Sequence, residues 1–156
     1  MPERQPSSRS CFVCGRDNPL GLKARWLSDR AAREVRCTIE IPEPFNGYPG
    51  IVHGGIVTAL LDEAMARTLL LDGGFEDLLV TGRMEVAFRN TTPTGTPVSV
   101  VARLGKRSAS RAQAEAELRL ADGTVTARAE ALMIRPPADV AAAWQAERAH
   151  WRVDED

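Results

Sequence analysis

The sequence predicts an α+β domain in which a curved antiparallel sheet of five to six strands wraps around one long central helix. Three observations support this prediction: a run of helix formers over residues 54–71, period-two alternation on both sides of it, and short turns between the later segments. Because single hydrophobic cores typically contain roughly 100 to 200 residues, a chain of 156 residues has room for one domain.

Two extended segments precede the helix. The first ends near Ser28, and the second spans residues 34–41 with apolar side chains at alternate positions, namely Val35, Cys37, Ile39 and Ile41. Such alternation is typical of a half-buried strand. Prolines and glycines then crowd residues 42–50, which predicts a shaped loop before the helix.

The central helix is predicted over residues 54–71, and Gly73-Gly74 follows where a left-handed C-cap belongs. Apolar residues occupy nearly every side of this segment, so we expect the helix to be enclosed. It is shorter than the ~20 residues needed to cross a bilayer, and charged residues interrupt it. No membrane span is expected.

Four further strands are predicted at residues 80–90, 97–104, 111–120 and 124–134. In the third of these, alanine or leucine alternates with charged or polar residues, which predicts one buried face and one wet face. The Asp122-Gly123 pair favours a tight hairpin between the last two strands.

The chain divides into three predicted segments. Residues 1–10 lack an apolar run, so we expect a disordered tail without a secretory signal. Residues 11–135 form the predicted domain, and residues 136–156 form a helical C-terminal extension. The formal charge of −1, from 20 Lys+Arg and 21 Asp+Glu, predicts no attraction to nucleic acid or to an anionic membrane. Three cysteines without a signal predict reduced thiols and a cytoplasmic location.

The segment His53-Gly54-Gly55 leads directly into the predicted helix. Free N–H groups and the macrodipole both attract negative charge to a helix N-terminus, and glycines allow a ligand carbonyl to approach closely. These are the requirements of an oxyanion site for acyl transfer. The alternative is that the glycines only make a tight junction and that His53 is a packed or capping residue.

Asp62 and Glu63 lie among apolar residues of the same helix. Burial raises the proton affinity of a carboxylate and suits it to basic or nucleophilic work. Adjacent helix residues point about 100° apart, so Glu63 can instead reach solvent or pair with Arg67. Gly54 and Asp62 are about 12 Å apart along one helix, too far to hold one carbonyl together, which predicts a site shared with a second subunit.

The stretch from Gly50 to Met65, with Asp62 nine residues after His53, strongly resembles the His-Gly-Gly motif of hotdog-fold thioesterases, the superfamily of 4-hydroxybenzoyl-CoA and phenylacetate-pathway thioesterases. The resemblance covers roughly residues 11–135 and implies the hotdog fold. It also implies that Asp62 is the catalytic carboxylate, that the Gly54 N–H is the oxyanion donor beside His53, and that Gly55 contacts substrate. The segment 11–22, with its Cys-x-x-Cys-Gly and Asn-Pro-x-Gly-Leu pattern, resembles the N-terminal signature of one branch.

The resemblance implies further contacts with substrate. Thr81 matches a position that helps to orient the attacking water, although a threonine at the start of a strand is common in any sheet. Asn46 lies near a position that faces the thioester in some relatives. Lys106, Arg107 and Ser108 lie in a turn that relatives place near coenzyme A phosphates, where cations give charge-assisted hydrogen bonds; an ordinary charged turn is the alternative.

The implied activity is that of an acyl-CoA thioesterase, which releases a free acid and coenzyme A. The implied assembly is a homodimer that pairs further into a tetramer, and the alternative function is a non-catalytic acyl-CoA-binding module of the same fold. No metal or cofactor is expected, with coenzyme A present only as part of substrate and product. Zinc normally takes four ligands, and beyond Cys11 and Cys14 only Cys37 and two histidines remain, so the pair is interpreted as a structural or family marker.

Overall fold

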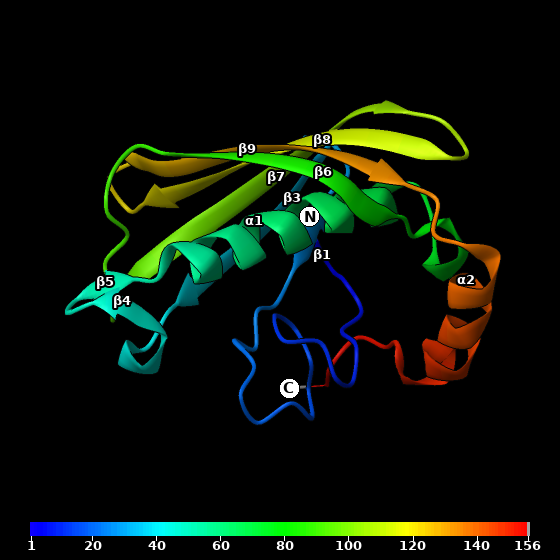
Figure 1. Ribbon diagram of the computed structural model, residues 1–156, viewed down its shortest axis with the longest axis horizontal. Coiled ribbons are helices and arrows are strands. Elements are labelled where there is room, and N and C mark those ends of the chain that lie inside the picture. Colours follow the sequence, from blue (N-terminus) through cyan, green and yellow to red (C-terminus); the bar gives the residue numbers. More distant parts are fainter. Residues whose placement is uncertain (156) are drawn as a thin grey trace.

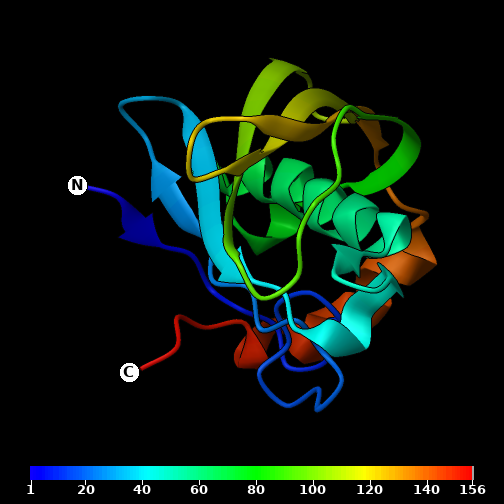
Figure 2. The ribbon, with the colours of Figure 1, turned by 90° about the vertical axis from the view of Figure 1, so that its left-hand side faces the viewer.

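The structure, a computed structural model, describes residues 1–155 and arranges them in three layers. Figure 1 shows a large sheet above, the helix α1 (Gly54–Arg67) beneath it, and the two terminal segments on the side of α1 away from the sheet. Figure 2 shows the same layers after a quarter turn. No helix in this part of the chain is long and apolar enough to cross a membrane.

The large sheet has seven antiparallel strands in the order β1-β2-β3-β7-β8-β9-β6. This confirms the predicted antiparallel sheet around one long helix: five strands are long, and two short N-terminal ones extend the sheet. The strand bounds are Glu3–Arg4 for β1, Leu27–Asp29 for β2, Glu34–Glu40 for β3, Val80–Phe88 for β6, Pro97–Arg107 for β7, Arg111–Leu120 for β8 and Val125–Ile134 for β9. A separate hairpin pairs β4 (Asn46–Tyr48) with β5 (Ile51–Val52).

Small side chains line the face of the sheet that meets α1. They alternate along the two central strands as Ala112, Ala114 and Ala116 in β8 and Ala127, Ala129 and Ala131 in β9, all of them buried. Because alanine adds only a methyl group, the helix can lie close to the sheet, and Leu60, Leu61 and Met65 fill the space between them at 0% exposure. As predicted, the helix is enclosed, and Gly55 is its only exposed residue.

The opposite face of the sheet is charged. Glu115 and Glu130 are exposed there, and Glu117 pairs with Arg119 and, at 2.8 Å, with Arg128. This is the wet face that the alternating pattern predicts. The hairpin between β8 and β9 also forms as predicted, with Gly123 at φ +87°, a conformation that favours glycine.

The end of the central helix differs from the prediction. Residues 68–71 continue α1 as a 3-10 turn, η2 (Thr68–Leu71), in which Thr68 Oγ1 donates to Met65 O at 2.6 Å. The predicted left-handed cap at Gly73-Gly74 is wrong, because neither glycine has a positive φ. The tightened turn satisfies terminal carbonyls without such a cap. Gly73 instead permits a close approach, since a Cβ there would lie 2.8 Å from Asp77 Oδ2.

The N-terminal residues are not the disordered tail that the sequence predicts. Besides the pairing of β1 with β2, the buried side chain of Gln5 donates to Ser28 Oγ at 2.8 Å and to Arg67 O at 3.1 Å. Ser7 forms a bridge with Arg152 near the other end of the chain. Polar side chains supply these contacts, which is why a search for apolar runs did not find them.

The C-terminal segment forms the predicted short helix and returns beneath α1. The helix α2 (Ala138–Trp144) continues as η4 (Gln145–His150). Trp151 then packs edge-on against Phe75, in the turn η3 (Phe75–Asp77), with ring centroids 5.8 Å apart. The Arg67 guanidinium lies 4.8 Å from the centroid of the Trp151 ring. The C-terminal segment is therefore fixed to the end of α1 by aromatic and cation–π contacts.

Candidate active site

The N-terminus of α1 is capped by a histidine side chain. His53 Nδ1 accepts a hydrogen bond from Gly55 N–H at 2.9 Å, and His53 N–H donates to Phe45 O at 2.9 Å. The ring lies so close to Gly55 that a Cβ on that residue would stand 3.0 Å from Nδ1. The capping role, which the sequence left open as an alternative, is therefore formed in the structure, and it uses the Gly55 amide.

The Gly54 amide at the same helix end has no partner. Ile56 N–H and Val57 N–H donate to His53 O at 2.9 and 3.2 Å, whereas Gly54 N–H finds no acceptor within residues 1–155. An unpaired N–H at the positive end of a helix dipole is suited to bind a carbonyl oxygen on which negative charge develops. Of the two glycines, only Gly54 can therefore supply the predicted oxyanion donor without breaking the cap.

A cavity of about 710 Å³ opens in front of this amide. Its lining includes Tyr48, His53, Gly54, Val57, Phe88 and Arg89. Tyr48 and Phe88 are large side chains that remain 75% and 55% exposed, which is unusual for single chains unless a ligand or partner covers them. The sequence analysis did not identify Tyr48, Phe88 or Arg89, since a lone aromatic at the end of a strand carries no signal of exposure.

Asp62 is paired with a residue of the edge strand β6. Thr81 Oγ1 donates to Asp62 Oδ1 at 2.6 Å, so the structure brings together two of the residues predicted for the site. The expectation that Asp62 is buried is wrong for the single chain, where Asp62 is partly exposed and Thr81 is exposed. The reason is that β6 ends the sheet, so the side of α1 next to it is open.

Asn46 lies beside the cavity but does not line it. It belongs to β4 and precedes Gly47, which is one of the lining residues. Its side-chain oxygen Oδ1 is buried and has no hydrogen-bond partner in the described part of the chain. An unpaired buried acceptor costs about 1–3 kcal/mol, so this oxygen is held ready for a donor.

The predicted phosphate contacts lie at the other end of α1. Arg107 Nη1 donates to Leu69 O at 3.2 Å and its guanidinium lies 3.6 Å from Asp77. Ser108 Oγ accepts from Arg111 N–H at 3.2 Å, so it holds the hairpin together, and Lys106 is exposed. Within one chain, these three residues are therefore not gathered with Gly54.

A second polar cluster lies on the other side of α1 from Thr81. Arg67 Nε donates to Glu63 Oε1 at 2.8 Å, the i,i+4 pair that the sequence offered as an alternative for Glu63. Arg67 Nη2 also reaches Cys14 Sγ at 2.7 Å. The pKa of Cys14 is lowered to about 7, first by its hydrogen bond with the Cys11 thiol. That same bond, together with burial, raises the pKa of Cys11.

Comparison with known families decides the relationship of this chain. The family model described as thioesterase superfamily matches residues 49–127, half of the chain. This chain belongs to the thioesterase superfamily. The matched range of this thioesterase superfamily member contains Gly54, Asp62 and Thr81 and begins well after the segment 11–22, so the match does not extend to the N-terminal signature.

Solved structures of other thioesterase superfamily proteins share the hotdog fold. Protein RHA08564 is 25% identical with a TM-score of 0.74, and the alignment covers 81% of this chain and 60% of that one. A Ralstonia eutropha phenylacetic acid degradation-related protein, a putative thioesterase by name, is 23% identical with a TM-score of 0.65 over 72% and 85% of the chains. The Streptococcus mutans protein smu.793, bound to acetyl CoA, is 18% identical with a TM-score of 0.60 over 65% and 80%.

Proposed function

We propose that this superfamily member is an acyl-CoA thioesterase that hydrolyses a thioester to a free acid and coenzyme A. The observation that carries the proposal is the unpaired Gly54 N–H at the positive end of α1, opening onto a cavity of about 710 Å³. In the proposed reaction this amide binds the thioester carbonyl oxygen. Asp62 either activates water or attacks the carbonyl carbon directly, and the Thr81 hydroxyl orients the carboxylate.

The thioesterase superfamily match supports this proposal, as does the acetyl CoA bound by the related Streptococcus mutans protein. In the same proposal Gly55 contacts the acyl group, Asn46 donates or accepts near the thioester, and coenzyme A enters as substrate rather than as a cofactor. Lys106, Arg107 and Ser108 bind its phosphates. The enzyme works in the cytoplasm and belongs to the branch that carries the Cys-x-x-Cys-Gly signature.

The active site is proposed to be shared between two copies of the chain. Gly54 and Asp62 are eight residues apart in one helix, about 12 Å at 1.5 Å per residue, which exceeds the span of one reacting carbonyl. A second copy with α1 antiparallel would place its Asp62 opposite Gly54. The same arrangement brings the hairpin with Lys106 toward the cavity of the other chain. The proposed assembly is a homodimer, with two dimers forming a tetramer.

The oxyanion role of Gly54 is tested with a matched pair of substitutions. Gly54→Pro removes the N–H at the first helical position, where proline is well tolerated, and His53 at ψ 134° already has the backbone that precedes proline. Gly54→Ala keeps the N–H and adds a similar Cβ. We expect Gly54→Pro to lower kcat by about 10²–10³ and Gly54→Ala to stay within about tenfold of wild type. Equal losses in both variants would show that the amide is not the donor.

The shared site is tested by mixing two inactive variants, Gly54→Pro and Asp62→Asn, after co-expression in one cell. A mixed dimer regains one intact site, so random pairing should restore about a quarter of the wild-type rate on an active acyl-CoA ester. No recovery, with mixed dimers demonstrated by mass spectrometry, would place the site within one chain. If wild type and Asp62→Asn are equally inactive on a panel of acyl-CoA esters yet bind them, the chain is a binding module instead.

A further inference from the structure

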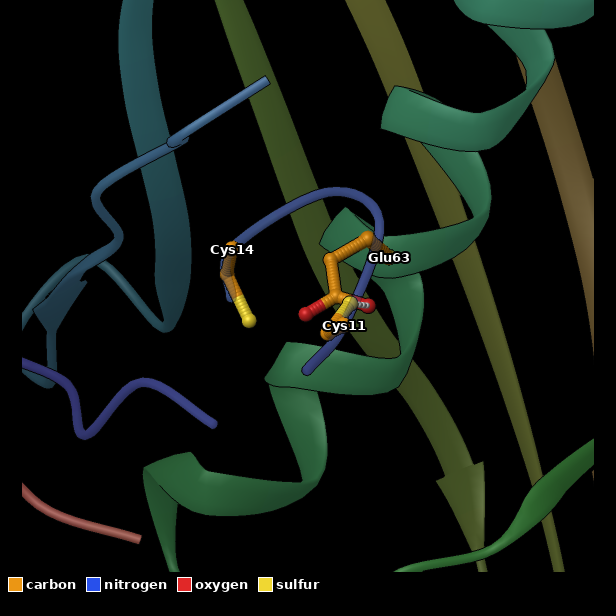
Figure 3. Close-up of side chains that lie close together, drawn as sticks. All are labelled: Cys11, Cys14 and Glu63. Carbon is orange, nitrogen blue, oxygen red and sulfur yellow. Dashed lines mark hydrogen bonds between the residues drawn. The ribbon is translucent and has the colours of Figure 1, made fainter. Parts of the chain in front are cut away.

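A Cys-x-x-Cys turn and a carboxylate from a distant part of the chain converge behind α1. Cys11 and Cys14 belong to the N-terminal loop, and Glu63 belongs to the helix; their sulfur and oxygen atoms all lie within 4.8 Å of one another. Figure 3 shows both sulfurs beside the Glu63 carboxylate, with the loop on one side and the helix on the other. Cys14 is buried, and Cys11 and Glu63 are partly buried.

The backbone of the turn holds the two thiols in place. Gly15 N–H donates to Cys11 O at 2.8 Å, and Val13 N–H donates to Cys11 Sγ at 3.3 Å. A Cβ on Gly15 would lie 2.3 Å from Cys11 O, so only glycine closes this turn. An amide N–H aimed at sulfur favours the thiolate, because hydrogen bonds to the charged form stabilise it. The turn is thus arranged to present thiolate ligands.

The separations fit one metal ion. Cys11 Sγ and Glu63 Oε2 are 3.7 Å apart. Ligands of a tetrahedral zinc, with Zn–S about 2.3 Å and Zn–O about 2.0 Å, stand about 3.5 Å from each other. Arg67 holds the other carboxylate oxygen, Oε1, at 2.8 Å, which leaves Oε2 directed toward the cysteines. Metal-binding carboxylates are typically oriented by such an outer hydrogen bond.

The charges of the cluster also balance around a divalent ion. With both thiols protonated, Glu63 and the buried Arg67 cancel each other. Binding Zn²⁺ would release two thiol protons and leave two thiolates, one carboxylate, one guanidinium and the ion, whose charges again sum to zero. A buried cluster whose net charge does not change on binding avoids the large cost of an uncompensated charge.

We propose that Cys11, Cys14 and Glu63 bind one thiophilic divalent cation, Zn²⁺ foremost, with water in the fourth position. The ion would fix the N-terminal loop to α1 one residue away from Asp62. The sequence-based expectation of no metal considers cysteines and histidines as the remaining ligands and therefore omits Glu63. The third ligand becomes visible only when the loop is folded against the helix.

The test uses the reduced, full-length protein and Co²⁺ alone as the probe. We expect one equivalent of Co²⁺ to produce thiolate-to-cobalt charge-transfer absorption and the intense visible bands of tetrahedral cobalt. Added Zn²⁺ should abolish both and raise the melting temperature. The absence of these bands, in protein whose three thiols are shown by titration to be reduced, would overturn the proposal. Bands that appear without any response to Zn²⁺ would also overturn it.

Variants identify the ligands, with Cys37 as the matched control. Cys11→Ser and Cys14→Ser should abolish the charge-transfer band. Glu63→Gln should weaken Co²⁺ binding by more than the roughly 10–100-fold typical of losing an outer-shell partner. Cys37→Ala should bind like wild type, because Cys37 lies in β3 at 1% exposure, with its pKa raised to about 11 by burial, outside the cluster.

Two results would contradict the ligand assignment: wild-type affinity in Glu63→Gln, or a loss in Cys37→Ala as large as in Cys14→Ser. Circular dichroism of each variant verifies that it is folded. Should Cys14→Ser not fold, the wild-type cobalt spectrum and the Glu63→Gln affinity decide the matter, because Gln keeps the shape of Glu and removes only its charge.

Discussion

Asp62 and Glu63 are neighbours in α1, yet they lie in opposite surroundings. Asp62 faces the open edge of the sheet, where Thr81 is its hydrogen-bond donor within residues 1–155. Glu63 faces the N-terminal loop, where Arg67 engages one oxygen and Cys11 approaches the other. A rotation of about 100° between adjacent helix residues thus separates a carboxylate with room for substrate from one that fixes two segments together.

The contrast continues in the partners of each acid. Thr81 is exposed, whereas Arg67 is 2% exposed and also contacts Pro6 O, Cys14 Sγ and the Trp151 ring. A cation buried in this way is costly to leave unpaired. Changes on the Asp62 side should therefore affect rate, and changes on the Glu63 side should affect stability.

The largest effect is expected from Asp62→Asn. Loss of the general base or nucleophile should lower kcat for an acyl-CoA ester by about 10²–10⁴, with no change in melting temperature. Asp72→Asn is the control, because Asp72 forms an exposed pair with Arg33 and should leave the rate unchanged. Steady-state kinetics and thermal melts of both variants would contradict the contrast if Asp62→Asn lost stability instead of activity.

Arg67→Met should be the most destabilising of the changes on the other side. Breaking a buried ion pair costs about 3–5 kcal/mol, because the remaining partner stays buried and unpaired. The matched change Arg33→Met breaks an exposed pair at 55% and 50% side-chain exposure, and such pairs contribute at most about 1 kcal/mol. Urea denaturation measures both, and equal midpoints would show that the Arg67 contacts do not stabilise the fold.

Thr81→Val should lower kcat by about tenfold, because a hydrogen bond to a charged group contributes about 1.5–3 kcal/mol. Valine keeps the branched shape, so the sheet should be unaffected. Thr81→Ser retains the hydroxyl and should recover most of the rate. If serine and valine reduce kcat equally, the methyl group rather than the hydrogen bond to Asp62 is what matters.

The smallest effect is expected at the helix cap. His53→Ala should destabilise the protein by about 1 kcal/mol, the usual cost of losing an N-cap acceptor. His53→Asn supplies another good capping side chain and should restore stability in denaturant titrations. Restored stability with a large remaining loss of kcat would give His53 the catalytic role in addition to the capping one.

Local pattern was enough to predict most of the fold. The predicted strand at residues 111–120 coincides with β8 (Arg111–Leu120), because strict alternation there marks both faces. β7 (Pro97–Arg107) runs past the predicted end at residue 104, since pairing with β8 resumes after an irregularity between Leu104 and Arg107. Gly73-Gly74 misled for the same reason: the 3-10 turn that replaces the cap depends on tertiary contacts.

The candidate site was predictable only in part. The cap at His53 and Gly55 is local, and the approach of Thr81 to Asp62 followed from the family resemblance. The exposure of Asp62 was not predictable, because it depends on which strand ends the sheet. The convergence of Glu63 with Cys11 depends on how the N-terminal loop docks, and no spacing in the sequence records that.

The alanine stripe of β8 and β9 constrains where an acyl group can go. Because the gap between helix and sheet is already filled by Leu60, Leu61 and Met65 at 0% exposure, no hydrocarbon tail fits under α1 without expelling a core side chain. Chain-length preference must then be set outside the core, at the rim where Tyr48 and Phe88 project. Enlarging or trimming those two rings is the direct way to retune which acids the protein releases.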